Sequence, residues 1–262
     1  MDHNKIGLSV ILPTINEGKN LKLLIPQIYK TLLTRNVIDS EILVMDDGSI
    51  DDTQDIVMKL SEDYPSTKII NRDSLPSLPM SIWDGIQLST KNYVMWLDAD
   101  GSMTPQGIDS MIEIFIEDVD QVVIGSRFAK NGGYKGVQSD NSNFFSALIR
   151  VYQSEDSILA VFLSKIFNNS IRLFLNCGVK DVTSGFIIGK KEYFLKSSFE
   201  QASYGDYFIY VIRNLKLKKI KMTEVGYICE TRKFGISKSG TSFKILFKRA
   251  LPYFTAAFKV IK

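Results

Sequence analysis

Residues 92–102 read Asn-Tyr-Val-Met-Trp-Leu-Asp-Ala-Asp-Gly-Ser, and the interpretation of the whole chain begins from them. The short apolar run 93–97 is rich in aromatic and β-forming residues and predicts a buried strand. Asp98 and Asp100 follow that strand at once. Because side chains two residues apart on extended backbone point the same way, both carboxylates can face one ligand. Open α/β sheets bind their ligands at this carboxyl edge of the strands.

Two neighbouring carboxylates repel each other unless a cation joins them. Hard oxygen ligands suit Mg²⁺ or Mn²⁺, and Mg²⁺ is usually held by one or two carboxylates together with substrate phosphates. The pair Asp98 and Asp100 therefore predicts a divalent-metal site. A solvated Asp-x-Asp turn has the same tripeptide, so the motif becomes informative only through the rest of the chain.

The first half of the chain alternates between predicted strands and predicted helices. This alternation is typical of a right-handed, mostly parallel sheet with helices on both faces, in an α/β fold. Asp46, Asp47, Asp98 and Asp100 each follow a strand, so we expect them to converge on one edge of the sheet. The predicted strands are 8–12, 41–45, 67–70 and 93–97, and the predicted helices are 20–33, 54–64, 81–88 and 105–116.

The second half is less regular. Residues 129–143 are rich in Gly, Asn, Ser and Asp and predict a loop, and 144–175 has helical spacing. We interpret about 129–176 as an insertion that faces an acceptor or a membrane. Further strands are predicted over 122–124, from 181–186 onward and over 220–227, with a helix over 204–215.

The composition excludes several chemistries. A chain of 262 residues, 45% apolar and 23% charged, is ordinary for one large globular domain. Two cysteines, Cys177 and Cys229, form neither a disulfide framework nor a zinc site. His3 is the only histidine, so a histidine base or a histidine-rich metal site is not expected.

Charge is unevenly spread along the chain. Residues 1–150 have a net charge of −8, whereas residues 151–262 have 19 Lys and Arg against 8 Asp and Glu, a net charge of +11. This asymmetry predicts a basic surface that meets an anionic partner, either membrane headgroups or nucleic acid. Solvated lysines without a partner are the plain alternative.

No uncharged apolar run reaches the roughly 18 residues that a spanning helix needs, and the N-terminus does not resemble a signal peptide. We therefore expect a peripheral protein at the cytoplasmic face of a membrane. The tail, 241–262, mixes phenylalanines with lysines, which predicts an amphipathic helix in the membrane interface. An ordinary helix packed on the core has the same pattern.

Six segments together resemble the inverting GT-A glycosyltransferases, and among them the dolichyl-phosphate (polyprenyl-phosphate) mannose synthases. The resemblance extends from residue 8 to about 240. It implies a GT-A (Rossmann-like) domain over 1–240 and a separate amphipathic segment over 241–262. The six segments, in chain order, are 10–17 (Val-Ile-Leu-Pro-Thr-Ile-Asn-Glu), 46–49 (Asp-Asp-Gly-Ser), 98–100 (Asp-Ala-Asp), 125–127 (Gly-Ser-Arg), 181–186 and 232–238.

The resemblance implies roles for individual residues. Asp98, Asp100, Arg127 and Arg232 match catalytic positions, and Asp98, Asp100 and Ser102 match the positions around a Mg²⁺ or Mn²⁺ cofactor. Ile15 stands where the family usually has Tyr, and Ser102 stands where it often has Gln. Arg150, Lys165 and Arg172 are candidates for the position of the family's acceptor-binding arginine. The nucleotide-sugar-binding positions are Pro13, Ile15, Glu17, Asp47, Asp98, Ala99, Asp100, Arg127, Arg232 and Lys238.

The function implied is transfer of a hexose, mannose favoured, from a nucleotide sugar to a polyprenyl phosphate at a membrane surface. GDP-mannose is the favoured donor and a UDP-sugar is the alternative. A phosphate acceptor needs no base, because its second pKa of about 6 leaves it largely dianionic. A sugar-hydroxyl acceptor needs one, and Asp181, Asp206 and Glu224 are candidates.

Two other classes of protein fit the sequence less well. A nucleotidyltransferase would show a glycine-rich phosphate loop near its N-terminus, where this chain has Pro-Thr-Ile-Asn-Glu. A nucleic-acid-binding protein would alternate lysines with aromatic residues on a recognisable module, and the acidic half would repel phosphate backbones. We therefore expect no nucleic-acid partner.

Overall fold

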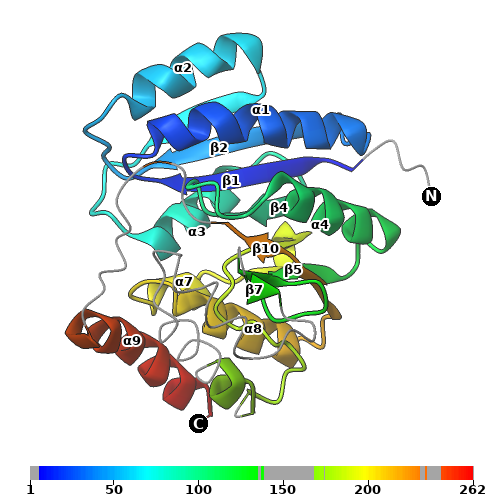
Figure 1. The fold of residues 1–262 in the computed structure, drawn as a ribbon, viewed down its shortest axis with the longest axis vertical. Helices are drawn as coiled ribbons and strands as arrows, with labels where there is room; N and C mark the ends of the chain where they lie inside the picture. The colour runs from blue at the N-terminus through cyan, green and yellow to red at the C-terminus, as the bar shows by residue number, and fades with distance from the viewer. Residues whose placement is uncertain are drawn as a thin grey trace.

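The structure, a computed structural model, describes residues 6–134, 137–138, 168–173, 175–230, 234 and 243–261 (Figure 1). Arg232 and Lys238, predicted to hold phosphates, lie outside the described residues, as do Arg150 and Lys165. Most of the predicted insertion, 129–176, lies outside them too.

A seven-stranded sheet forms the centre of the molecule, in the order β3-β2-β1-β4-β8-β5-β9. Six strands run parallel, and β8 alone is antiparallel to its neighbours β4 and β5. The predicted α/β class with a mostly parallel sheet is confirmed. The strands are β1 (Leu8–Thr14), β2 (Ser40–Asp46), β3 (Thr67–Asn71), β4 (Tyr93–Trp96), β5 (Val122–Ser126), β8 (Ile187–Lys190) and β9 (Met222–Gly226).

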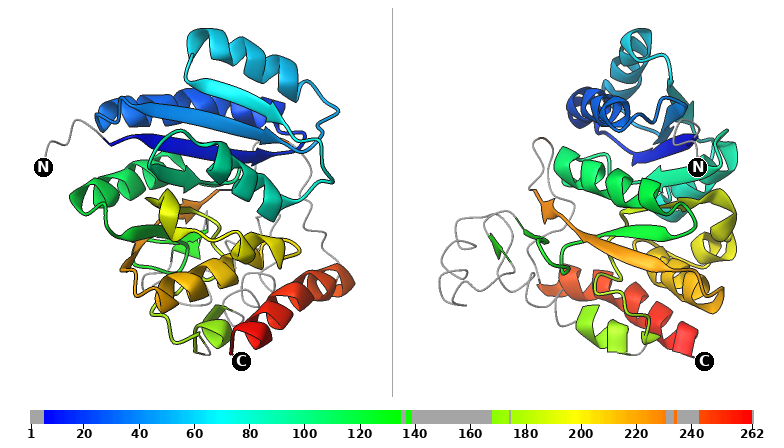
Figure 2. Two further views of the ribbon diagram at one scale, coloured as in Figure 1. Left: turned by 180° about the vertical axis from the view of Figure 1, so that it is seen from behind. Right: turned by 90° about the vertical axis from the view of Figure 1, so that its right-hand side faces the viewer.

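Helices cover both faces of this sheet, as predicted. Alternate residues of β1 point to opposite faces: Val10 and Leu12 enter one apolar cluster, and Ile11 enters the other. The right-hand view of Figure 2 shows the sheet between α1 and α4 on one side and α3 and α8 on the other. The helices are α1 (Gly18–Thr34), α2 (Thr53–Asp63), α3 (Leu78–Leu88), α4 (Pro105–Glu117), α7 (Ser197–Glu200), α8 (Tyr207–Leu217) and α9 (Phe243–Ile261).

Capping residues set several helix ends. The Thr104 hydroxyl accepts a hydrogen bond from the Gly107 N–H at 3.2 Å and Pro105 opens α4, as the sequence predicts. α3 begins three residues before its predicted start because the Ser77 hydroxyl caps it. α1 starts at Gly18 and continues through Pro26, so this proline does not mark its beginning.

The strand predicted to begin within 181–186 starts later. Residues 181–186 form a loop and β8 begins at Ile187. Gly185 has a φ of +70°, in the left-handed region, which interrupts extended backbone. A small second sheet of β10 (Ile228–Cys229), β6 (Gly133–Tyr134) and β7 (Val137–Gln138) was not predicted, because two-residue strands have no periodic signal.

The C-terminal helix α9 lies at the end of the molecule opposite α2 (Figure 1). It packs on α8 through Ala256 and Ala257, which are 0% and 6% exposed. In the part of the chain that the structure describes, no helix combines the length and apolar character needed to cross a bilayer.

Gly85 allows α3 to approach β1 closely. An added Cβ would lie 2.5 Å from Cγ2 of Ile11 and 3.2 Å from Cγ of Met45. We expect Gly85→Ala to lower the free energy of unfolding by about 1–2 kcal/mol, because overpacking outweighs the better helix propensity of alanine. Chemical denaturation measures this change. Gln87→Ala, at an exposed position of the same helix, serves as the control; a stabilised Gly85→Ala protein would contradict the packing described.

Candidate active site

A cleft of about 300 Å³ opens at the carboxyl edge of the sheet. It contains seven of the residues that the sequence predicts to bind a nucleotide sugar. These are Pro13, Ile15, Glu17, Asp47, Asp98, Ala99 and Asp100. The remaining lining residues are Thr14, Pro76, Ser77, Leu78, Ser203 and Tyr204.

The topology of the sheet explains why residues so distant in sequence meet. β1 lies between β2 and β4, and all three are parallel, so the loops after them leave from the same edge. Gly48 and Gly101 have φ angles of +84° and +75°, which let the chain turn sharply just after the acidic residues. The two Asp-containing loops therefore both reach the cleft.

Asp46 and Asp47 face different surroundings although they are adjacent. Asp46 is fully buried, and its carboxylate accepts hydrogen bonds from Ser49 and from Gln54 Nε2 at 3.2 Å. Asp46 therefore stabilises the loop after β2 by these hydrogen bonds and does not line the cleft. Asp47 lines the cleft and is 7% exposed.

Arg72 holds a cleft residue in place, a role that was not predicted from the sequence. Its guanidinium forms an ion pair with Asp47 and donates from Nε to Asp84 at 2.8 Å. The second Asp47 oxygen accepts from the Ser81 hydroxyl at 2.6 Å and from the Ser77 N–H at 3.1 Å. These donors hold the Asp47 carboxylate at the wall of the cleft. No local pattern around Arg72 signals this role, since the contact depends on how the loop before α3 folds.

Asn20, also missed, connects the cleft with the segment after β10. Its side-chain amide donates to Glu17 Oε2 at 2.7 Å and to the Phe234 carbonyl at 3.2 Å. Asn20 is 4% exposed and belongs to the first turns of α1. It thereby sets the orientation of the Glu17 side chain in the cleft.

The predicted metal residues separate into two groups. Asp98 and Asp100 line the cleft, and Asp100 is 6% exposed. Ser102 does not line it; its N–H donates to Asp100 Oδ1 at 2.9 Å and its carbonyl accepts from the Glu230 N–H at 2.9 Å. The Ser102 backbone thus holds Asp100 in place from outside the cleft.

Among the described residues, no group of three or more His, Cys, Asp and Glu side chains is placed to hold a metal ion without help. The carboxylate oxygens of Asp98 and Asp100 are nevertheless hard donors that line a cleft of about 300 Å³. That combination fits the mode in which one or two carboxylates and substrate phosphates share a divalent cation.

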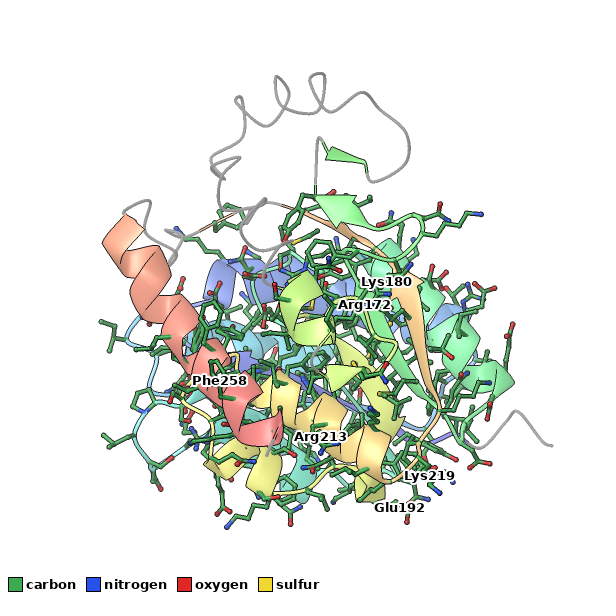
Figure 3. All side chains as sticks on the ribbon, turned by 90° about the horizontal axis from the view of Figure 1, so that it is seen from below. Arg172, Lys180, Glu192, Arg213, Lys219 and Phe258 are labelled. Carbon is green, nitrogen blue, oxygen red and sulfur yellow. The ribbon has the colours of Figure 1, made fainter. Side chains whose placement is uncertain are left out.

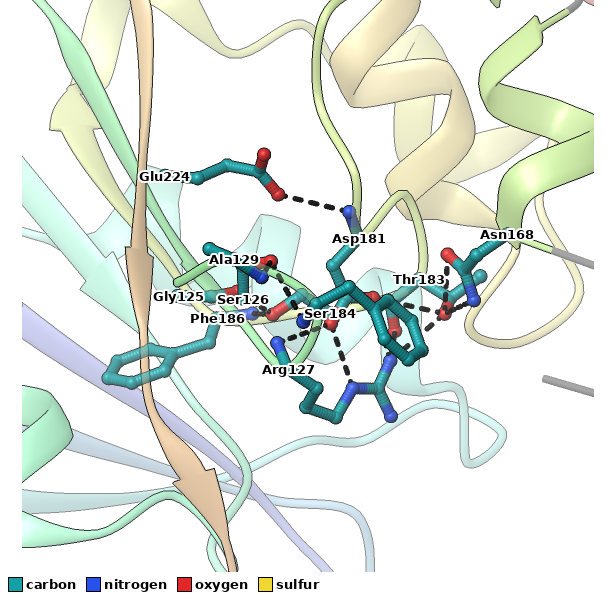
Figure 4. Close-up of polar contacts among 11 residues, drawn as sticks. Gly125, Ser126, Arg127, Ala129, Asn168, Asp181, Thr183, Ser184, Phe186 and Glu224 are labelled. Atoms are coloured by element: carbon teal, nitrogen blue, oxygen red, sulfur yellow. Dashed lines mark hydrogen bonds and ion pairs between the residues drawn. The ribbon is translucent and has the colours of Figure 1, made fainter. Parts of the chain in front are cut away.

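Arg127 lies outside the cleft lining, in a buried network with Asp181 (Figure 4). Its Nε donates to Asp181 Oδ2 and its Nη2 to Asp181 Oδ1, both at 2.8 Å. Nη2 also donates to Thr183. Burial disfavours the charged guanidinium, but Asp181 raises the pKa of Arg127 well above its usual value. Arg127 therefore stays charged and oriented.

A model of a known protein family matches most of this chain. The family model described as "Glycosyl transferase family 2" matches residues 9–197, a span that begins at the second residue of β1 and includes every acidic cleft residue. The chain is a member of glycosyl transferase family 2.

Curated relatives of this glycosyltransferase have informative names. It is 30% identical over 255 residues to a dolichol-phosphate mannosyltransferase of Pyrococcus furiosus, covering 97% of this chain and 64% of the relative. The chain thus spans less than two thirds of that protein. It is 25% identical to a polyprenol monophosphomannose synthase of Mycolicibacterium smegmatis, covering 90% of this chain and 82% of the relative.

Solved structures share the fold of this glycosyltransferase. Glucosyl-3-phosphoglycerate synthase from Mycobacterium tuberculosis, in complex with Mn²⁺, UDP-glucose and phosphoglyceric acid, superposes with a TM-score of 0.65 at 14% identity. The match covers 98% of this chain and 80% of that one. The same enzyme with Mg²⁺ and UDP gives a TM-score of 0.61 at 16% identity, covering 98% and 79%.

We expect Asp181→Asn to lower the free energy of unfolding by about 3–5 kcal/mol, because it leaves the Arg127 guanidinium buried without its counter-charge. Urea denaturation measures the loss. Glu200→Gln, which removes one partner of the exposed Lys196–Glu200 pair, should leave stability unchanged and is the matched control. Equal stability of the two variants would contradict a buried, charged network.

Proposed function

We propose that this glycosyltransferase moves a hexose, with mannose favoured, from a nucleotide sugar to a polyprenyl phosphate, with inversion at the anomeric carbon. The observation that carries the proposal is the cleft that gathers Glu17, Asp47, Asp98 and Asp100 at the carboxyl edge of the sheet. The names of the archaeal and mycobacterial relatives support mannose, and hence GDP-mannose, as donor. A UDP-sugar is the alternative donor.

The chemistry requires stabilisation of a leaving diphosphate. The bond between the anomeric carbon and the diphosphate breaks, and negative charge grows on the departing nucleotide. A Mg²⁺ or Mn²⁺ ion bound beside Asp98 and Asp100 would supply positive charge there. Pro13, Ile15 and Asp47 would hold the nucleotide, with an aliphatic contact to the base at Ile15.

The placement of three other acids favours a phosphate acceptor over a sugar hydroxyl. Asp181 is bound to Arg127, Glu224 Oε1 accepts from the Asp181 N–H at 3.0 Å, and Asp206 accepts from two backbone N–H groups. None of them lines the cleft, so none is placed there to deprotonate a hydroxyl. A dianionic phosphate attacks without such a base.

The acceptor phosphate would meet cationic side chains. Arg127, already charged and oriented by Asp181, is one candidate, and Arg232 and Lys238 remain predictions because they lie outside the described residues. The excess of positive charge in residues 151–262 suits an anionic lipid headgroup.

The outer face of α9 supports peripheral association with a membrane surface, which we predict to be the cytoplasmic face. Leu251, Phe254 and Phe258 are 53%, 42% and 68% exposed, and their spacing places them on one side of the helix, away from Ala256 and Ala257. Figure 3 looks at this end of the molecule and labels Phe258 on α9 and Arg213 on the adjoining α8, with Arg172, Lys180, Lys219 and the acidic Glu192 farther from α9. Apolar side chains beside cations fit an anionic lipid surface.

Transfer from labelled GDP-mannose or UDP-glucose to a short polyprenyl phosphate, with and without Mn²⁺, tests the reaction. We expect product with the phosphate and none with the matching polyprenol. Asp98→Asn and Asp100→Asn should each lower the rate by about a hundredfold or more, because each removes a carboxylate ligand of the divalent cation that would stabilise the leaving diphosphate. Asp52→Asn, at an exposed position after β2, is the control. Full activity in both cleft variants, or transfer to the polyprenol, would contradict the proposal.

Sedimentation with vesicles containing phosphatidylglycerol tests the membrane surface. We expect the wild type to sediment at low salt and the double variant Phe254→Asp/Phe258→Asp to remain in solution, because it removes apolar contacts and adds negative charge. Ile38→Asp changes an equally exposed apolar residue, 73% exposed, far from α9, and should bind like the wild type. Unchanged sedimentation of the double variant would exclude this face.

A further inference from the structure

We propose that Tyr253 of the C-terminal helix α9 is a positioning residue for donor binding, because it supports the wall of the cleft formed by Ser203 and Tyr204. This inference rests on the proposed role of the cleft as the nucleotide-sugar site. The helix α9 would then support the donor cleft with its inner face and contact a membrane with its outer face.

The sheet edge supplies only part of the cleft. Ser203 and Tyr204 come from the connection between α7 and α8 and line the same cleft as Asp98 and Asp100. The Asp206 carboxylate, 2% exposed, accepts from the Ser203 N–H at 3.0 Å and from the Tyr204 N–H at 2.7 Å. These bonds fix the local shape of the segment, and the position of the segment as a whole depends on what lies behind it.

The Tyr253 phenol lies directly behind this segment, against Gly205. A Cβ added at Gly205 would stand 2.0 Å from the Tyr253 hydroxyl oxygen and 3.0 Å from Cζ. Gly205 is not among the glycines with positive φ, so its backbone would accept alanine and only this contact forbids it. The glycine therefore serves close packing between the cleft wall and α9.

The environment of the phenol agrees with this position. Burial raises the pKa of Tyr253, and the proximity of Tyr204, Asp206 and Asp98 raises it further. The hydroxyl thus stays neutral at physiological pH, and the Tyr253 side chain is partly buried between the helix and the cleft wall. Tyr253 does not itself line the cleft, so it acts through Gly205 and its neighbours.

The rest of α9 fixes where Tyr253 sits. Ala256 and Ala257 are buried against α8, and Arg213 Nε donates to the Val260 carbonyl at 2.9 Å. A shift of the helix on α8 would carry Tyr253 with it and change the support behind Ser203 and Tyr204. The position of α9 on α8 is therefore coupled to donor binding through the contact between Tyr253 and Gly205.

Titration of GDP and UDP in the presence of Mn²⁺ into four purified proteins tests the coupling. The proteins are the wild type, Gly205→Ala, Tyr253→Phe and the double variant, and thermal unfolding confirms that each is folded. We expect Gly205→Ala to weaken nucleotide binding by about tenfold, because the new methyl group displaces the cleft wall from the Tyr253 hydroxyl. Tyr253→Phe removes the clashing oxygen, so the double variant should regain most of the lost affinity.

Thr255→Ala, at an exposed position of α9 near Tyr253, is the control and should bind as the wild type does. Wild-type affinity in a folded Gly205→Ala protein would overturn this inference alone. Failure of Tyr253→Phe to restore binding in the double variant would also overturn it, since the loss would then not act through Tyr253. A wild type that binds neither nucleotide would overturn the assignment of the cleft as well.

Discussion

The central feature of the structure is a cluster of acidic side chains at the carboxyl ends of three parallel strands. Because β1, β2 and β4 are neighbours, the loops after them bring Glu17, Asp47, Asp98 and Asp100 into one cleft of about 300 Å³. Protein donors meet part of that charge: Arg72 pairs with Asp47, and the Ser102 N–H binds Asp100. Carboxylates in this arrangement suit a divalent cation shared with a diphosphate.

Much of this site could be predicted because its residues are local to strand ends. Apolar runs locate β1, β2 and β4, and the acidic residues of the cleft follow within one to four positions. The parts that escaped prediction are long-range. Arg72 reaches Asp47 from the loop before α3. The antiparallel β8 lies between β4 and β5, and a strand of only four residues does not reveal its direction or its neighbours in the sequence. Arg127, predicted as a phosphate-binding residue, is placed by Asp181 just outside the cleft lining.

The excess of positive charge in residues 151–262 agrees with the proposed anionic acceptor. Arg172, Lys180, Arg213 and Lys219 lie at the end of the molecule that carries α8 and α9. Asp181, Asp206 and Glu224, the candidate bases for a hydroxyl acceptor, are engaged in structural hydrogen bonds. The pattern of the C-terminal tail allowed two interpretations, an interfacial helix and a helix packed on the core. One face of α9 packs on α8, as the second interpretation predicts, and the other exposes Phe254 and Phe258. The location in a membrane interface stays a prediction.

Crystals grown with Mn²⁺ and a nucleoside diphosphate provide the most direct measurement, because the anomalous scattering of manganese locates the ion without reference to any assumed mechanism. The account predicts a single strong peak in the cleft, coordinated by the carboxylate of Asp98 or Asp100 and by oxygens of the diphosphate. A nucleotide bound elsewhere, or a manganese peak remote from both carboxylates, would contradict it.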